Sequence, residues 1–303
     1  IFSSLQKLAY LLAMGLFRVL LALSVVTSHL IYWNAPLYKG FGGTNSVEIF
    51  FLISGFYIAM ILDKTYRNKK MFYLNRALRL YPVYLIVCFC VILTALFRDG
   101  VAQNLFGYPP LVLAISTFSN LTMIGTDWLM FFDTANGGIH FTGPELVGDR
   151  MRDLLWVAPA WSLGIEITFY AIAPLLCRMR SRLLLTLVGA IIVCRFFFNQ
   201  SNLNFAESPF DAKFFPFELP FFLSGILLYR LKRDSKFEIK LPIRYVYLLL
   251  MACYAGFGLV GQRFDLSRVS SMTILISVAA FIILFCENNE FDRKLGEISY
   301  PIY

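Results

Sequence analysis

The stretch FRVLLALSVVTSHL, residues 17–30, decides how the chain is expected to fold, because this apolar run nonetheless contains Arg18 and His29. It lies within a longer apolar segment, residues 9–33, and roughly 20 such residues cross a bilayer as a helix. A charged side chain at the bilayer centre costs roughly 2.5–3.5 kcal/mol, so an ionisable residue inside a membrane usually has a function. The stretch therefore predicts a membrane helix that carries two functional polar side chains.

The composition of the whole chain also indicates a membrane protein. Of the 303 residues, 58% are hydrophobic and only 15% are charged, whereas soluble domains are nearer a quarter charged. The net charge of +8 is expected to lie in cytoplasmic loops. No stretch pairs a basic face with the spacing of a nucleic-acid motif, so the predicted partner is the lipid bilayer and not nucleic acid.

Further apolar segments predict an all-α, polytopic transmembrane bundle of about 9–10 spans. The segments are residues 9–33, 46–62, 80–97, 156–177, 183–199, 215–230, 243–261 and 271–286, and one more begins near residue 295. Residues 110–126 are short and rich in Ser, Thr and Asn, and are interpreted as a span, a re-entrant piece or an interfacial helix. No long polar linker interrupts the series, so residues 1–303 are expected to form a single domain that is cut off within its last helix.

The distribution of charge predicts the orientation of these segments. Residues 63–79 contain six basic side chains and one acidic side chain, which is typical of a cytoplasmic loop. Residues 127–155 contain five acidic and two basic side chains and are expected on the outer side. The first span then runs outward, and His29 is predicted near its outer end.

Arg18 and His29 are expected to share one helix face. Eleven residues correspond to about three turns plus 20°, and to about 16 Å along the axis. One face would then line a polar channel, with the arginine deep and the histidine at the mouth, where a neutral imidazole suits a general base. The alternative is a buried pair that only bonds neighbouring helices.

Three carboxylates fall in or beside predicted spans. Glu48 begins the second span, where it would either orient His29 or interact with a helix N-terminus. Glu166 lies more than a turn inside residues 156–177, and therefore needs a partner or a raised pKa. Glu218 lies between two prolines that break helix hydrogen bonding, an arrangement that usually lines a cavity.

A pair of basic side chains and the second histidine complete the candidates. Arg76 and Arg79 are three residues apart at the entrance of the third span, where they suit phosphate recognition or simply anchor the span. His140 lies in an outer loop and is interpreted as solvated. No zinc-binding spacing occurs, so neither a metal site nor a tightly bound cofactor is predicted.

Six pieces of the sequence, in order, resemble the integral membrane acyltransferase 3 family. They are Arg18 followed by ten residues and His29, VEIFFLISGF (47–56), NRALRLYPVY (75–84), WSLGIEITFY (161–170), FFLSGILL (221–228) and LGEISYPIY (295–303). Together they cover nearly the whole chain. Two departures are Glu48, where many members have Asp, and Ile167, where a second acidic residue is often found.

The resemblance implies an enzyme of a bacterial-type inner (plasma) membrane that crosses it several times. Such an enzyme moves an acyl group, most commonly acetyl, from cytoplasmic acyl-coenzyme A to a hydroxyl of an extracytoplasmic saccharide. We predict three groups of site residues on this basis: catalytic His29, Glu166 and Glu48; acyl-coenzyme A-binding Arg18, Arg76 and Arg79; and substrate-binding Trp161, Ser162 and Glu218. Residues 127–155 and 200–214 are expected to select the acceptor.

Several points stay open at this stage. His29 acts either as a general base or as a transient acyl carrier, and either Glu48 or Glu166 supports it. A transporter or flippase of a saccharide-linked or acyl substrate is the alternative class, because it also tolerates intramembrane Arg, His and Glu. A sensory membrane protein that binds a ligand without turnover is a third class.

Overall fold

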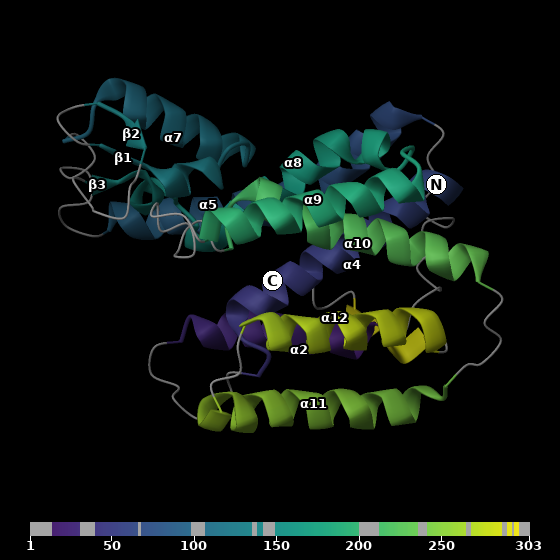
Figure 1. Cartoon of the computed structure of the whole chain (residues 1–303). Coiled ribbons are helices and arrows are strands. Elements are labelled where there is room, and N and C mark those ends of the chain that lie inside the picture. The colour runs from purple at the N-terminus through teal and green to yellow at the C-terminus, as the bar shows by residue number, and fades with distance from the viewer. Residues whose placement is uncertain are drawn as a thin grey trace. The chain divides into compact units, whose positions relative to one another are not determined.

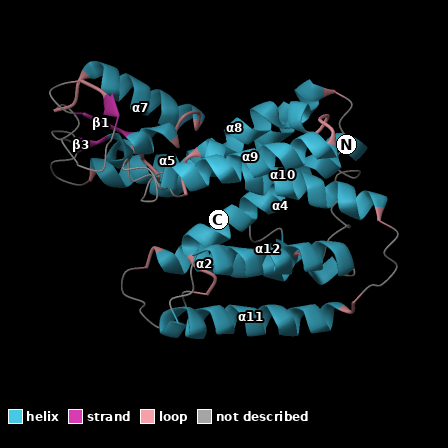
Figure 2. Cartoon of the chain, viewed as in Figure 1, coloured by secondary structure: helices cyan, strands magenta, loops and turns pink. Residues whose placement is uncertain are grey.

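The computed structural model describes residues 14–30, 40–65, 68–97, 107–134, 138–141, 149–199, 212–235, 241–264, 268–286, 290–292 and 294–296. These residues are mainly helical, which confirms the predicted all-α class (Figures 1 and 2). The chain divides into two compact units, Ile1–Thr65 with Phe221–Tyr303, and Tyr66–Pro220. The single domain over residues 1–303 stays a prediction.

The long helices follow the predicted apolar segments. They are α2 (Gly15–Ser28), α4 (Gly43–Lys64), α5 (Lys69–Leu96), α7 (Pro110–Thr122), α8 (Trp161–Leu176), α9 (Ser181–Asn199), α10 (Phe215–Asp234), α11 (Ile243–Phe264) and α12 (Arg268–Phe285). Among the described residues, four helices are long and apolar enough to cross a membrane. They are α4, α5, α8 (counted from Ala158) and α9. Of the last segment, which is expected to begin near residue 295, residues 297–303 lie outside the described residues.

The interpretation of residues 110–126 as a full span does not fit the length of α7. This helix has 13 residues, which corresponds to about 20 Å, whereas the hydrocarbon core of a bilayer is about 30 Å thick. The re-entrant and interfacial interpretations of this segment are the ones that the length allows.

Helix α5 begins earlier than the predicted span 80–97. The side chain of Asn68 accepts a hydrogen bond from the backbone N–H of Lys70 at 2.9 Å, which is the bonding of a helix N-cap. Arg76 and Arg79 consequently lie within the helix, on one face, and not in a preceding loop.

In the first unit, α2 and α4 form an antiparallel pair. At one end, a methyl group on Gly43 would lie 2.3 Å from the Oγ of Ser28, so the start of α4 touches the end of α2. At the other end, the guanidinium carbon of Arg18 lies 5.9 Å from the ring centroid of Tyr57. The pair therefore places the neighbour of His29 against the first turn of α4.

Glycines allow α4 and α10 to approach closely within the same unit. A methyl group on Gly55 would lie 2.1 Å from the carbonyl oxygen of Phe222, and one on Gly225 would lie 2.0 Å from that of Leu52. The ring of Phe222 stacks on Phe51 with the centroids 4.8 Å apart. This contact gives a physical reason for the glycines in the stretches VEIFFLISGF and FFLSGILL.

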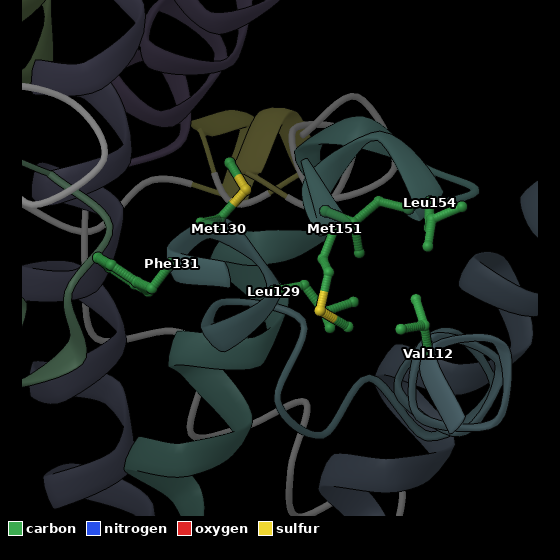
Figure 3. Close-up of a cluster of buried hydrophobic side chains, with 7 residues drawn as sticks. Val112, Leu129, Met130, Phe131, Met151 and Leu154 are labelled. Carbon is green, nitrogen blue, oxygen red and sulfur yellow. The ribbon is translucent and has the colours of Figure 1, made fainter. Parts of the chain in front are cut away.

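In the second unit, the segment between α7 and α8 contains a small antiparallel sheet that the sequence analysis did not predict. Its strand order is β2-β1-β3, formed by β1 (Phe132–Thr134), β2 (His140–Phe141) and β3 (Asp149–Arg150). The 3₁₀ turns η1 (Trp128–Phe131), η2 (Met151–Leu154) and η3 (Ala158–Ala160) flank it. Figure 3 shows buried side chains that pack together here: Val112 of α7 with Leu129, Met130, Phe131, Met151 and Leu154 of the segment.

A buried amide ties this segment to α7. The side chain of Asn120 donates hydrogen bonds to the carbonyl oxygens of Ser116 at 2.8 Å and Leu154 at 2.9 Å. Its own oxygen accepts from the backbone N–H of Trp156 at 2.9 Å. Because the amide is completely buried, these bonds hold the chain on both sides of the sheet in place.

Candidate functional site

His29 is the C-cap residue of α2, and its side chain is exposed at the end of the helix. Its Nδ1 lies 2.8 Å from the carbonyl oxygen of Val25, one turn earlier in the helix. A carbonyl oxygen only accepts hydrogen bonds, so Nδ1 is the protonated nitrogen of the neutral ring. The remaining nitrogen, Nε2, then carries a lone pair and suits a general base.

Arg18 and His29 lie at opposite ends of the same straight helix, as the eleven-residue spacing predicts. The half-buried guanidinium group of Arg18 lies over the ring of Tyr57 in α4, which provides a cation–π contact. The structure thus keeps Arg18 among side chains of its own unit, three turns from the histidine.

Glu48 is 1% exposed and lies in the second turn of α4. The first turn of α4 contains no acidic residue, so the helix-end interpretation of Glu48 is not supported. From the contact between Gly43 and Ser28, five residues bring Glu48 about 7.5 Å along α4. The carboxylate is therefore within about two turns of His29 along the helix pair.

Glu166 is held by its own helix. The hydroxyl group of Tyr170, one turn later in α8, donates a hydrogen bond to Oε1 of Glu166. The guanidinium carbon of Arg76 lies 6.0 Å from the centroid of the same ring, and Tyr170 also interacts electrostatically with Arg79. Glu166, Tyr170 and the two arginines form one polar cluster between α5 and α8, which we call the arginine cluster.

Trp161 and Ser162, the other two predicted site residues in the WSLGIE stretch, lie at the start of α8. The hydroxyl of Ser162 donates to the carbonyl oxygen of Pro159 at 3.0 Å, which satisfies this buried side chain locally. The Nζ of Lys213 lies 5.6 Å from the ring centroid of Trp161. Neither contact tests the substrate-binding role, which stays a prediction.

Glu218 has a basic neighbour within its unit. The carboxylate is completely buried, and Oε1 lies 4.0 Å from Nη1 of Arg195 in α9. The same guanidinium group donates to the carbonyl oxygen of Phe217 at 3.4 Å and stacks over the phenyl ring of that residue. A buried ion pair of this kind can orient α10 against α9, so the substrate-binding role of Glu218 also stays a prediction.

Asp127 is a polar residue that the sequence analysis did not single out. It lies outside the spans, yet it is 1% exposed, and burial raises the pKa of its carboxyl group to about 6 against the opposing effect of two backbone N–H groups. A methyl group on Gly164 would lie 2.9 Å from its Oδ1, so the carboxyl group packs directly on the WSLGIE stretch. The preceding Thr126 donates to the carbonyl oxygen of Ala160 at 2.9 Å and anchors this packing.

The predicted site residues thus form two sets. The first unit holds Arg18, His29 and Glu48, and the second holds Arg76, Arg79, Trp161, Ser162, Glu166 and Glu218. His140 lies in β2 and is exposed. Within the part of the chain that the structure describes, no group of three or more His, Cys, Asp or Glu side chains is arranged to hold a metal ion.

These features define the class of the protein, a helical integral membrane protein with polar site residues on apolar helices. Residues 11–303 match the model of a family described as an acyltransferase domain, acyltransferase 3. The chain belongs to this family of acyltransferases, as the motif resemblance predicts.

One similar protein is the peptidoglycan O-acetyltransferase OatA of Listeria monocytogenes serovar 1/2a. The two sequences are 29% identical over 163 residues, which are 52% of this chain and 22% of that protein. The match therefore spans about a fifth of the length of the relative. No solved structure matches this chain significantly.

Proposed function

We propose that the protein is a multi-pass enzyme of a bacterial-type inner membrane that transfers an acyl group, acetyl in the first instance, from acyl-coenzyme A to a hydroxyl of a cell-surface or exported saccharide. Membership of an acyltransferase family supports the reaction type. The relative named for peptidoglycan O-acetylation supports acetyl as the group and a glycan as the acceptor. The single observation that carries the proposal is His29, exposed at the end of an apolar helix with Nε2 available as a base.

The arginine cluster is the proposed site for the phosphates of coenzyme A. Arg76 and Arg79 present two guanidinium groups on one face of α5, and planar guanidinium groups suit phosphate oxygens. The ring of Tyr170 supports Arg76 from one side. Acyl-coenzyme A is a donor substrate in this scheme and not a resident cofactor.

The proposed chemistry is a single acyl transfer. Nε2 of His29 takes the proton of the saccharide hydroxyl while the oxygen attacks the thioester carbonyl carbon. The carbon–sulfur bond breaks, and the imidazolium of His29 gives the proton to the departing thiolate of coenzyme A, so the products are an ester and free thiol and the base is regenerated. In a two-step variant, the imidazole carries the acyl group before the hydroxyl accepts it.

Of the two candidate carboxylates, Glu48 is the one that we assign to His29. Glu48 belongs to the helix pair that carries His29, whereas the carboxylate of Glu166 accepts the hydroxyl of Tyr170 beside Arg76. The negative charge of a buried carboxylate on the same helix pair would stabilise the imidazolium that forms when the proton is taken up. Glu166 is then a part of the donor site.

The saccharide acceptor is proposed to contact residues 127–155. This segment carries the small sheet and the exposed His140, on a rigid base of buried side chains. The segment 200–214, which we also expect to contribute, lies outside the described residues up to residue 211.

The test uses purified protein in lipid nanodiscs with radiolabelled acetyl-coenzyme A and a panel of polysaccharides that includes peptidoglycan. Wild type is compared with His29→Ala, and Thr186→Val is the control, because the exposed hydroxyl of Thr186 donates to the carbonyl oxygen of Leu183 within α9, away from the proposed site residues. We expect label on the saccharide with wild type and with Thr186→Val, and none with His29→Ala. Transfer that persists without His29 would refute its role, and saccharide uptake into proteoliposomes without labelling would indicate a transporter.

A further inference from the structure

The start of α2 is capped by a side chain from the far end of the chain. One carboxylate oxygen of Asp292, Oδ2, accepts the backbone N–H of Gly15 at 2.6 Å, and the other, Oδ1, accepts that of Leu16 at 3.0 Å. The hydroxyl of Tyr247 in α11 donates to Oδ1 at 2.8 Å. The carboxylate is 1% exposed, so these three bonds form away from solvent.

This contact supplies hydrogen-bond acceptors that the residues at the start of α2 do not provide. The first N–H groups of any helix have no acceptor within the helix, and the N-cap residue usually supplies one. Met14 at this N-cap makes no side-chain hydrogen bond, and the first turn contains no acidic residue. Asp292 supplies both the missing acceptors and the negative charge that a helix N-terminus favours, from 277 residues away.

The contact is too close for any side chain on the first residue of α2. A methyl group on Gly15 would lie 1.6 Å from the backbone carbonyl oxygen of Asp292. A methyl group on Gly296 would lie 3.3 Å from the Cα of Gly15. The two glycines therefore bring the backbone of Asp292 and of Gly296 directly against the first turn of α2.

Arg18 lies at this junction. Its N–H makes the first backbone hydrogen bond of the helix, to the carbonyl oxygen of Met14 at 3.0 Å. Side chains in a helix tilt toward its N-terminus, so the guanidinium group points back toward the anchored turn. Its Nη1 would lie 3.5 Å from a methyl group placed on Gly296.

We propose that Asp292 is a positioning residue for Arg18: its carboxylate holds the first turn of α2, and the segment that carries it abuts the guanidinium group. The inference rests on the proposed function, together with the prediction from the sequence that Arg18 binds acyl-coenzyme A and lines one polar channel with His29. The stretch LGEISYPIY thereby gains a role for its first two residues, since Leu295 and Gly296 belong to the segment that completes the arginine site.

The experiment compares wild type with Asp292→Ala, Asp292→Asn and Arg18→Ala, and with the double variant Arg18→Ala/Asp292→Ala. Glu290→Gln is the matched control, because Glu290 belongs to the same segment but forms an exposed ion pair with Lys294. For each variant, kcat and KM for acetyl-coenzyme A are measured together with the melting temperature. Hydrogen exchange is followed in peptides that cover residues 14–20.

We expect Asp292→Ala to lower kcat/KM for acetyl-coenzyme A by roughly 10- to 100-fold, because a displacement of about 1 Å in a positioned group has that effect. Asp292→Asn keeps one carbonyl acceptor and should lie between Asp292→Ala and wild type. The double variant should be no slower than Arg18→Ala alone, since Asp292 acts through Arg18. Multiplying losses in the double variant would overturn the proposal, as would wild-type kinetics in Asp292→Ala.

Two cases need a further comparison: a variant that does not fold, and wild type that shows no transfer. If Asp292→Ala does not fold, Asp292→Asn and Tyr247→Phe, which removes only one donor to the carboxylate, carry the same comparison. If wild type transfers no label to any acceptor, the proposed function fails, and hydrogen exchange alone judges the anchor. Faster exchange at the start of α2 in Asp292→Asn then supports the anchor, and unchanged exchange refutes it.

Discussion

The close contact between α4 and α10 makes a sharp prediction about Gly55 and Gly225. Each glycine faces a backbone carbonyl group of the other helix, and not the movable end of a side chain. A methyl group on Gly55 would fall roughly 1.3 Å short of ordinary contact with the carbonyl oxygen of Phe222, since it would lie at 2.1 Å and ordinary contact begins at 3.4 Å. Gly55→Ala must therefore move one helix away from the other by about this amount.

The expected cost follows from the packing that this movement disrupts. Overpacking a well-packed core costs roughly 1–3 kcal/mol, and small residues at helix contacts are what permit close approach in membranes. The stacked rings of Phe51 and Phe222 would separate as well. With about 2–4 °C per kcal/mol, Gly55→Ala and Gly225→Ala should each lower the melting temperature by several degrees.

The assay is thermal unfolding of the purified protein in detergent, followed by tryptophan fluorescence. Gly189→Ala and Gly256→Ala are matched controls in helix interiors, because nothing lies within 4 Å of a methyl group at either position. These two changes should leave stability unchanged or raise it by up to about 1 kcal/mol, since alanine favours helix. The double variant at the contact should lose less than the sum of the single losses, because both changes force the same separation.

The prediction would be refuted if Gly55→Ala and Gly225→Ala had the same melting temperature as the two controls. Such a result would mean that α4 and α10 do not pack through these glycines. Strictly additive losses would mean that each methyl group meets a different obstacle.

Three other changes have defined outcomes. Asp127→Asn should flatten the dependence of the free energy of unfolding on pH. Burial raises the pKa of this carboxyl group in the folded protein from 3.8 to about 6, so wild type loses roughly 3 kcal/mol of its free energy of unfolding as the pH rises from 4 through 6. The amide of the variant is neutral throughout and should show no such loss. Tyr170→Phe should raise KM for acetyl-coenzyme A while keeping the ring under Arg76, because Glu166 loses the hydroxyl that it accepts. Asn120→Ala should lower the free energy of unfolding by about 2–3 kcal/mol, because buried backbone groups lose their partners.

Each of these changes has a control on an exposed or local contact. For Asp127, unfolding between pH 4 and 8 is compared with that of Asp153→Asn, an exposed carboxylate, and an unchanged slope in Asp127→Asn would contradict the prediction. For Tyr170, the comparison is Tyr73→Phe, whose exposed hydroxyl donates to the carbonyl oxygen of Ala171 at 3.0 Å. For Asn120, it is Thr122→Val, whose exposed hydroxyl donates to the carbonyl oxygen of Phe118 and accepts from the backbone N–H of Ile124.

The apolar segments, the all-α class and the family were all predictable from the amino-acid order. An apolar run of about 20 residues indicates a membrane helix by local composition alone, and an eleven-residue spacing places Arg18 and His29 on one face of it by helix geometry. The paired arginines also belong to one turn-spaced face of α5, as the sequence indicates. These features depend only on residues that are neighbours along the chain.

The tertiary structure decided which groups these residues meet. Arg76 of α5 lies over the ring of Tyr170 in α8, Glu218 lies near Arg195, and Asp127 packs on Gly164. The small sheet between α7 and α8 was missed because its strands are only two or three residues long, too short to show an alternating pattern.

The capping of α2 by Asp292 is the clearest case of this division. The cap and first turn of α2 contain no side-chain acceptor for its first N–H groups, whereas Asp292 is followed in the sequence by Arg293 and Lys294, which are the nearer donors. Their pairing depends on the packing of helices whose residues are 277 positions apart. Sequence by itself therefore determined what each segment is, because burial and periodicity are local, whereas the fold decided which polar atoms pair, because pairing requires contact between distant segments.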